Sequence, residues 1–267
     1  MKKIVLSVLL FCFVFGFAAA IDDRGVGFTA GVDVSLGDVA DDVVFKLIPN
    51  VEYANSFGAF DILAYLEYGI AFDDPDNVQN LYGELEGFYN LRISNPGLLT
   101  VGVYTEHDLH LAPDLGDDVR TYNLIIEPRA MYTHSFDFGD LFGRVGVPIT
   151  PMHQGVLDDD DELGLGVNFR LGWQSTFGLG AHVTANMDFK PDSEYTGTDL
   201  LISYEMEDFG LYAEVEFSAN KDFDIFSITP KVEYHITNMF WVWGEVEFSG
   251  LGDEAVVVPT LGVKASF

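Results

Sequence analysis

Apolar and polar side chains alternate through nearly the whole chain after residue 20, and a period of two is typical of β-strands with two different faces. In residues 25–36, for example, Val26, Phe28 and Ala30 share one face with Val32 and Val34, while glycine, threonine, aspartate and serine occupy the other. The pattern recurs in about fourteen segments, which are 25–36, 43–54, 59–72, 80–93, 98–107, 121–134, 140–149, 163–174, 179–189, 199–206, 210–218, 224–236, 239–248 and 255–267. No stretch after residue 20 has a helical period, so we expect an all-β protein.

The connections between these segments alternate in length. Short turns such as 55–58 and 175–178 join one pair of strands, and longer acidic segments such as 73–79 and 108–120 join the next. This predicts an antiparallel up-and-down sheet with short turns on one rim, long loops on the other, and an even number of strands. Closed on itself, such a sheet is a β-barrel of about fourteen strands.

Five prolines complicate that count, because proline has no N–H for the hydrogen-bond ladder and a closed barrel has no free edge to hold it. They are Pro49, Pro128, Pro148, Pro230 and Pro259. We expect each proline to lie at a β-bulge or at a strand end. Shorter strands would leave twelve strands as the alternative.

Charge is unusually high for so apolar a chain. The sequence has 43 acidic and 13 basic residues, a net charge of −30, and yet a mean hydropathy of +0.17. A chain this acidic does not favour nucleic acid as a partner, and a hydrophobic content of 48% excludes general disorder.

The charged residues within the expected strands all fall on the polar face. The fifteen acids are Asp33, Glu52, Asp61, Glu67, Glu84, Glu86, Glu106, Glu127, Asp188, Glu205, Glu214, Glu216, Glu233, Glu245 and Glu247. The seven bases are Lys46, Arg92, Arg129, Arg144, Arg170, Lys231 and Lys264. The packed core of a soluble β-sandwich or lipocalin-type barrel does not accommodate fifteen carboxylates. A barrel with its apolar face toward lipid and its polar face toward water does, so we expect these residues to line a pore.

Aromatic residues of the apolar face gather near both ends of the strands. Near the short turns they are Tyr53, Phe60, Tyr89, Tyr132, Trp173, Tyr234, Phe240 and Phe267. Near the long loops they are Phe45, Phe72, Tyr122, Phe189, Phe217, Phe226 and Phe248. The chain resembles the bacterial outer-membrane β-barrels, the porin-like superfamily, which have two such aromatic belts, short turns on one rim and long loops on the other.

The resemblance implies a transmembrane barrel with periplasmic short turns and extracellular acidic loops. Its expected partners are outer-membrane lipid, periplasmic chaperones and the barrel-assembly machinery. That machinery would read Phe267 as the terminal aromatic of its assembly signal.

The first twenty residues predict export. Lys2 and Lys3 precede an apolar run over 4–17 and three alanines at 18–20, which is the pattern of a secretory signal peptide cleaved after Ala20. The run is shorter than the ~20 residues of a transmembrane helix. Residues 21–267 are then expected to form one barrel domain in the outer membrane, without disulfides because the only cysteine, Cys12, is removed.

A fourteen-stranded barrel is expected to be too wide for side chains to fill, and no segment of plug length is evident. The sequence therefore predicts a porin-like channel for passive diffusion of small hydrophilic solutes. The excess of acids over bases on the polar face predicts a preference for cations. No cofactor and no enzymatic activity are expected.

Two alternative functions stay open at this point. A surface-exposed binding protein or adhesin would act through the acidic loops, of which residues 158–162 offer carboxylates for Ca²⁺ but lack the spacing of a dedicated loop. An outer-membrane barrel enzyme, or a metal site, would use His107, Asp108 and His110. Solvated charge is the simpler interpretation of both segments, so we assign neither a metal nor a catalytic site.

Overall fold

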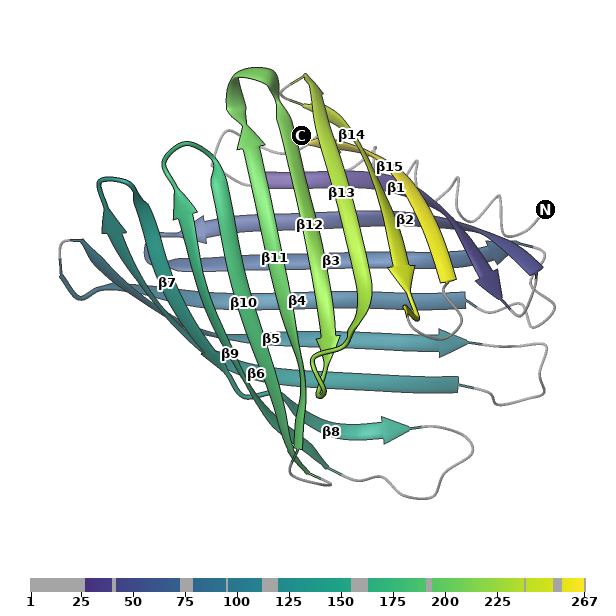
Figure 1. The fold of residues 1–267 in the computed structure, drawn as a ribbon, viewed down its shortest axis with the longest axis horizontal. Coiled ribbons are helices and arrows are strands. Elements are labelled where there is room, and N and C mark those ends of the chain that lie inside the picture. Colours follow the sequence, from purple (N-terminus) through teal and green to yellow (C-terminus); the bar gives the residue numbers. More distant parts are fainter. Residues whose placement is uncertain are drawn as a thin grey trace.

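A computed structural model describes residues 27–39, 42–72, 79–94, 96–111, 120–154, 163–190, 194–237, 239–251 and 256–266. The predicted signal peptide, Phe267 and the acidic run at 158–162 lie outside the described residues. The strands are β1 (Gly27–Val39), β2 (Asp42–Phe57), β3 (Phe60–Phe72), β4 (Gln79–Arg92), β5 (Gly97–Leu111), β6 (Arg120–Phe136), β7 (Gly139–Gly146), β8 (Ile149–Gln154), β9 (Gly164–Ser175), β10 (Leu179–Lys190), β11 (Glu194–Met206), β12 (Leu211–Asn220), β13 (Ile225–Thr237), β14 (Phe240–Ser249) and β15 (Val256–Ser266), with a single 3₁₀ turn, η1 (Glu207–Phe209) (Figure 1). No helix among these residues is long and apolar enough to cross a membrane.

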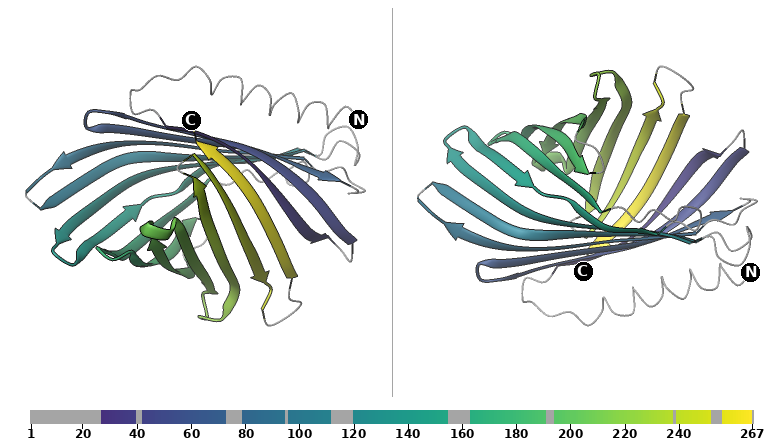
Figure 2. Two further views of the ribbon diagram at one scale, coloured as in Figure 1. Left: turned by 90° about the horizontal axis from the view of Figure 1, so that it is seen from above. Right: turned by 90° about the horizontal axis from the view of Figure 1, so that it is seen from below.

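The strands form one closed antiparallel sheet. Each strand pairs with its neighbours in sequence, except that β7 and β8 both pair with β6 and β9 instead of with each other, and β15 pairs with β1 to close the ladder. Figure 2 shows the sheet curving round so that its first and last strands lie side by side. In Figure 1 the strands β9–β14 cross in front of β1–β6 at a steep angle, as tilted strands on opposite walls of a barrel do.

The wall consists of fourteen strands, as the sequence predicted, and the alternative of twelve is wrong. The segments β7 and β8 occupy one position in the wall, because both lie between β6 and β9. The break between them falls at Val147 and Pro148.

Proline placement differs from the expectation of bulges and strand ends. Only Pro148 lies at a strand break, whereas Pro49, Pro128, Pro230 and Pro259 lie within strands. Pro49, for example, pairs with Val32 of β1, but the ladder toward β3 skips it. The physical reason is that each N–H of an antiparallel strand points toward one neighbour only, so a proline removes one hydrogen bond and leaves the other side of the strand paired.

The outer face of the sheet is apolar and the enclosed face is polar, which is the reverse of a soluble protein. Large apolar side chains are exposed on the outside, and Leu171 and Leu261 retain 58% and 69% of their accessible surface. Asp33, Asn50 and Glu127 on the enclosed face are buried, with 4–6% exposure. The apolar surface is therefore arranged to face lipid, and the polar surface is the inner wall.

Several short turns end in a Phe-Gly pair, as at Phe57-Gly58 and Phe177-Gly178. Gly58 and Gly178 have φ values of 68° and 93°, a region that side chains disfavour and that reverses the strand direction tightly. Several strand boundaries differ from the prediction, among them those of β5, which continues to Leu111, and of β11, which begins at Glu194. Both extensions bring residues predicted to be in loops into the wall.

Candidate functional site: the polar inner wall

The strand register brings the predicted pore-lining residues of neighbouring strands together. Glu84 of β4 lies directly opposite Glu106 of β5. On the other side of the barrel, Lys231 of β13 lies between Glu214 of β12 and Glu245 of β14. The inner wall is therefore an ordered arrangement of charges rather than a random scatter.

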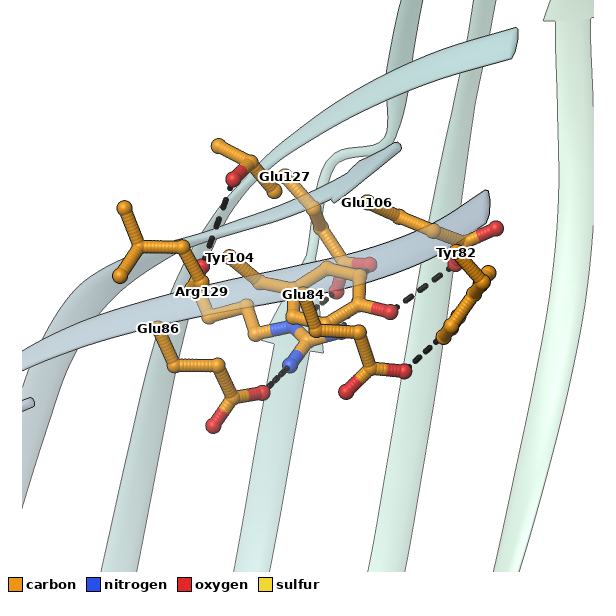
Figure 3. A network of polar contacts seen from close by, with 9 residues as sticks. Tyr82, Glu84, Glu86, Tyr104, Glu106, Glu127 and Arg129 are labelled. Carbon is orange, nitrogen blue, oxygen red and sulfur yellow. Dashed lines mark hydrogen bonds and ion pairs between the residues drawn. The ribbon is translucent and has the colours of Figure 1, made fainter. Parts of the chain in front are cut away.

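The most connected group is centred on Arg129 of β6 (Figure 3). Its Nε and Nη2 atoms donate hydrogen bonds of 2.7 and 3.1 Å to the two carboxylate oxygens of Glu127. Its Nη1 atom donates to Glu86 of β4 at 2.6 Å, and its guanidinium lies 3.8 Å from the ring centre of Tyr104. Each of its three nitrogens donates to a carboxylate and its guanidinium lies by an aromatic ring, so contacts from three strands hold it against the wall.

Four tyrosines on the inner wall were not among the predicted residues. Each hydroxyl donates to the glutamate two positions later, in the pairs Tyr65–Glu67 (2.6 Å), Tyr82–Glu84, Tyr104–Glu106 (2.9 Å) and Tyr212–Glu214 (2.5 Å). Residues two apart share a face of a strand, so the recurring sequence Tyr-x-Glu was the signal that could have identified them. These contacts orient four hydroxyls and four carboxylates along the wall without neutralising the carboxylates.

Asp33 forms a second network near the first and last strands. Its Oδ2 accepts a hydrogen bond of 2.5 Å from Asn50, and its Oδ1 accepts one of 3.0 Å from the indole Nε1 of Trp243. Two amines, Lys231 and Lys264, lie 5.3 and 5.8 Å from the Trp243 ring centre. Trp243 therefore contacts both an acid and two bases of the wall.

Other predicted residues have simpler surroundings. Asp61 accepts a hydrogen bond of 2.5 Å from Asn90, Lys231 lies 3.4 Å from Glu214, and Glu233 contacts His235 at 2.7 Å. Arg144 and Arg170 are in register on β7 and β9. The structure does not join the remaining predicted residues to these networks, namely Lys46, Glu52, Arg92, Asp188, Glu205, Glu216 and Glu247.

Asp199 is an inner-wall acid at the very start of the predicted strand 199–206, and it is not among the predicted pore-lining residues. Because β11 begins five residues earlier, Asp199 pairs with Thr184 of β10 and Ser218 of β12 and accepts a hydrogen bond of 3.1 Å from Asn186. A run of polar residues before it concealed the strand start.

The three residues considered for a metal or enzyme site lie on opposite faces of one strand. His107, Asp108 and His110 all lie in β5, where alternation directs His107 to the face opposite the other two. His107 contacts the hydroxyl of Tyr122 at 2.7 Å, and His110 contacts Asp108 at 2.9 Å. No group of three or more potential metal ligands is present among the described residues.

No family model and no curated protein sequence matches the chain. Among solved structures, the Ralstonia pickettii toluene transporter TbuX is similar over 92% of this chain and 90% of its own, with 10% identity and a TM-score of 0.54. CdiB from Acinetobacter baumannii is similar over 91% of this chain and 60% of its own, with 9% identity and a TM-score of 0.50. A mutant of the Rhodopseudomonas blastica porin aligns over 91% and 99% of the two chains, with 11% identity and a TM-score of 0.45. At these identities the similarity is one of fold alone, that of a closed antiparallel β-barrel.

Proposed function

We propose that this protein is an outer-membrane channel for passive diffusion of small hydrophilic solutes, with a preference for cations. The observation that carries the proposal is the inverted polarity of a closed fourteen-stranded barrel. Charged side chains such as Lys231 and Glu214 lie on the enclosed face and keep 27% and 18% of their side-chain surface accessible, while large apolar side chains such as Leu261 are exposed on the outside of the wall. A packed interior would leave these charges without water, whereas a water-filled bore solvates them.

The nature of the solute follows from the wall. TbuX is described as a toluene transporter, but the inner wall of the present chain is lined by carboxylates, guanidinium groups and tyrosine hydroxyls. Such a surface favours hydrated ions and polar molecules over aromatic hydrocarbons. Hydrophilic solutes are therefore proposed here.

The cation preference follows from the balance of charge. The inner-wall acids outnumber the bases, and Asp199 adds to their excess. Arg129 offsets part of it by pairing with Glu86 and Glu127, but the two carboxylates still outnumber the one guanidinium. A fixed negative wall concentrates cations and repels anions at distances up to about a Debye length.

The test is recording from the refolded protein in a planar bilayer. Discrete conductance steps with a reversal potential on the cation side are expected when the two compartments hold different KCl concentrations. Absence of any conductance from a correctly folded barrel would reject the channel. A reversal potential on the anion side would retain the channel and reject its proposed selectivity.

A further inference from the structure

Two arginines of the inner wall lie side by side without the partners that an arginine pair requires. Arg144 of β7 and Arg170 of β9 are directly opposite each other in the ladder. Both side chains point to the same face, so their first side-chain atoms are only about 5 Å apart. Like charges in directly opposed positions destabilise a sheet, and such a pair is therefore a cost to the fold.

Neither arginine is neutralised. Among the described residues, no carboxylate lies within 4.0 Å of either guanidinium. The Nε atom of Arg170 donates to the hydroxyl of Thr184 at 2.9 Å, while the Nε atom of Arg144 is buried without any hydrogen-bond partner. A buried N–H without an acceptor is uncommon, and here it belongs to a charged group.

Two acids near the pair, Glu127 and Asp199, are already engaged elsewhere. Glu127 is held by two hydrogen bonds from Arg129, and its carboxylate lies over Gly146, in space that a side chain at that position would fill. Asp199 lies beyond Thr184 in the same row and is bound by Asn186. The inner wall therefore contains one arginine that is paired with two carboxylates, Arg129, and two described arginines that have no carboxylate within 4.0 Å.

A neighbouring amide adds a further unused group. Asn168 lies two residues before Arg170 on the same face of β9 and is 8% exposed. Its Oδ1 has no hydrogen-bond partner. This oxygen is shielded from solvent, so the wall beside the arginine pair contains a buried polar atom that is not satisfied by the protein.

We propose that Arg144 and Arg170 form a binding site on the inner wall for the oxyanion of a small solute that carries a phosphate or carboxylate group. Guanidinium groups bind these oxyanions with two parallel hydrogen bonds. The site rests on the proposed channel function, since the bore is the route by which a solute reaches it. The channel would then favour cations overall and still contain one local binding site for anionic solutes.

The experiment uses glycerol phosphate as the probe and glycerol as its neutral control, added to the refolded protein in a planar bilayer with KCl. Glycerol phosphate is expected to reduce the K⁺ current in a saturable manner, and glycerol is not. Replacing both arginines, Arg144→Gln with Arg170→Gln, should raise the half-blocking concentration at least about tenfold, the consequence of losing one or more charge-assisted hydrogen bonds.

A matched variant separates a site from general electrostatics. Lys46→Gln with Arg92→Gln removes the same charge from the inner face at other places, and it should leave the half-blocking concentration within about twofold of the unmodified protein. An equal loss in both variants would overturn the site. The variant Arg144→Lys with Arg170→Lys keeps the charge and the fold, and should show a loss of intermediate size because lysine does not bind bidentately.

Binding is also measured without conduction, by titration calorimetry of glycerol phosphate into the detergent-refolded protein. Saturable heat that the glutamine variant lacks supports the site even if the barrel does not conduct, in which case the channel proposal alone fails. A conducting barrel with neither block nor heat would overturn the site and leave the channel intact.

Discussion

The indole Nε1 of Trp243 donates a hydrogen bond of 3.0 Å to Oδ1 of Asp33, although 210 residues separate the two in sequence. Trp243 belongs to β14 and Asp33 to β1, and β15 lies between them in the wall. Asn50 of β2 donates to the other oxygen of Asp33. One carboxylate therefore connects strands on both sides of the ladder that closes the barrel, where the two ends of the sheet meet.

The first prediction concerns that hydrogen bond. Trp243→Phe keeps an aromatic ring but removes the donor, leaving one oxygen of a carboxylate that is 6% exposed without its protein partner. The free energy of unfolding is expected to fall by about 1–3 kcal/mol. Urea unfolding of the refolded protein, followed by the mobility of folded and unfolded forms on cold gels, measures the change. Trp241→Phe is the control, because Trp241 lies on the same strand as Trp243 but its ring stacks on His235 of β13, with the ring centres 5.3 Å apart. Equal losses in the two variants would contradict a specific role for the Asp33 contact.

The second prediction concerns Gly262 of β15, which lies between those two residues in the ladder. A methyl group at this position would overlap both the Asp33 carboxylate and the Trp243 indole. Gly262→Ala is therefore expected to destabilise the barrel by an amount comparable to Trp243→Phe, and to cost less when Trp243 is already phenylalanine. Gly143→Ala is the matched control, because no atom lies within 4 Å of the methyl group it would introduce. Thermal shifts of both variants decide the point, and an unchanged Gly262→Ala barrel would show that the wall relaxes easily there.

The third prediction concerns Arg129, which pairs with both Glu86 and Glu127. Arg129→Gln leaves Glu86 and Glu127 close together without their shared counter-charge. We expect a loss of about 2 kcal/mol or more near neutral pH, since each lost hydrogen bond joins two charged groups. The loss should shrink at acid pH, where glutamates become protonated and no longer repel each other. Unfolding of both proteins at pH 7 and pH 4 measures this difference. Arg92→Gln, which removes the same charge at the exposed end of β4, is expected to have little effect at either pH.

The fourth prediction concerns selectivity. Replacing Glu214, Glu216, Glu245 and Glu247 by glutamine removes four negative charges from the wall formed by β12 and β14. The cation preference should decrease while the conductance persists. In both proteins the preference should weaken as salt rises, because screening shortens the reach of fixed charges from about 8 Å at physiological ionic strength to about 3 Å at 1 M. The same four positions changed to aspartate retain the charge and should retain the reversal potential. An unchanged reversal potential in the glutamine variant would place the selective part of the bore elsewhere.

The alternation of side chains determined the fold class, the number of wall strands and the face on which each residue lies. Leu171 and Leu261 are exposed on the outside because period two assigns each residue a face, and the charges share the other face for the same reason. The Phe-Gly pairs in several short turns indicate where the chain reverses direction. These properties are local, so a single strand read by itself carries them.

Only the tertiary structure decided which residues of the inner wall touch. Alternation gives a face but not a register, and sliding one strand by two residues keeps every side chain on its face while changing all its partners. The contact of Asp33 with Trp243, the saturation of Arg129 and the isolation of Arg144 beside Arg170 all depend on that register. Asp199 entered the wall because ladder hydrogen bonds to β10 and β12 extended β11 beyond its alternating segment. Interstrand hydrogen bonds and turn geometry across the closed barrel set the register, and those are properties of the whole sheet rather than of any segment.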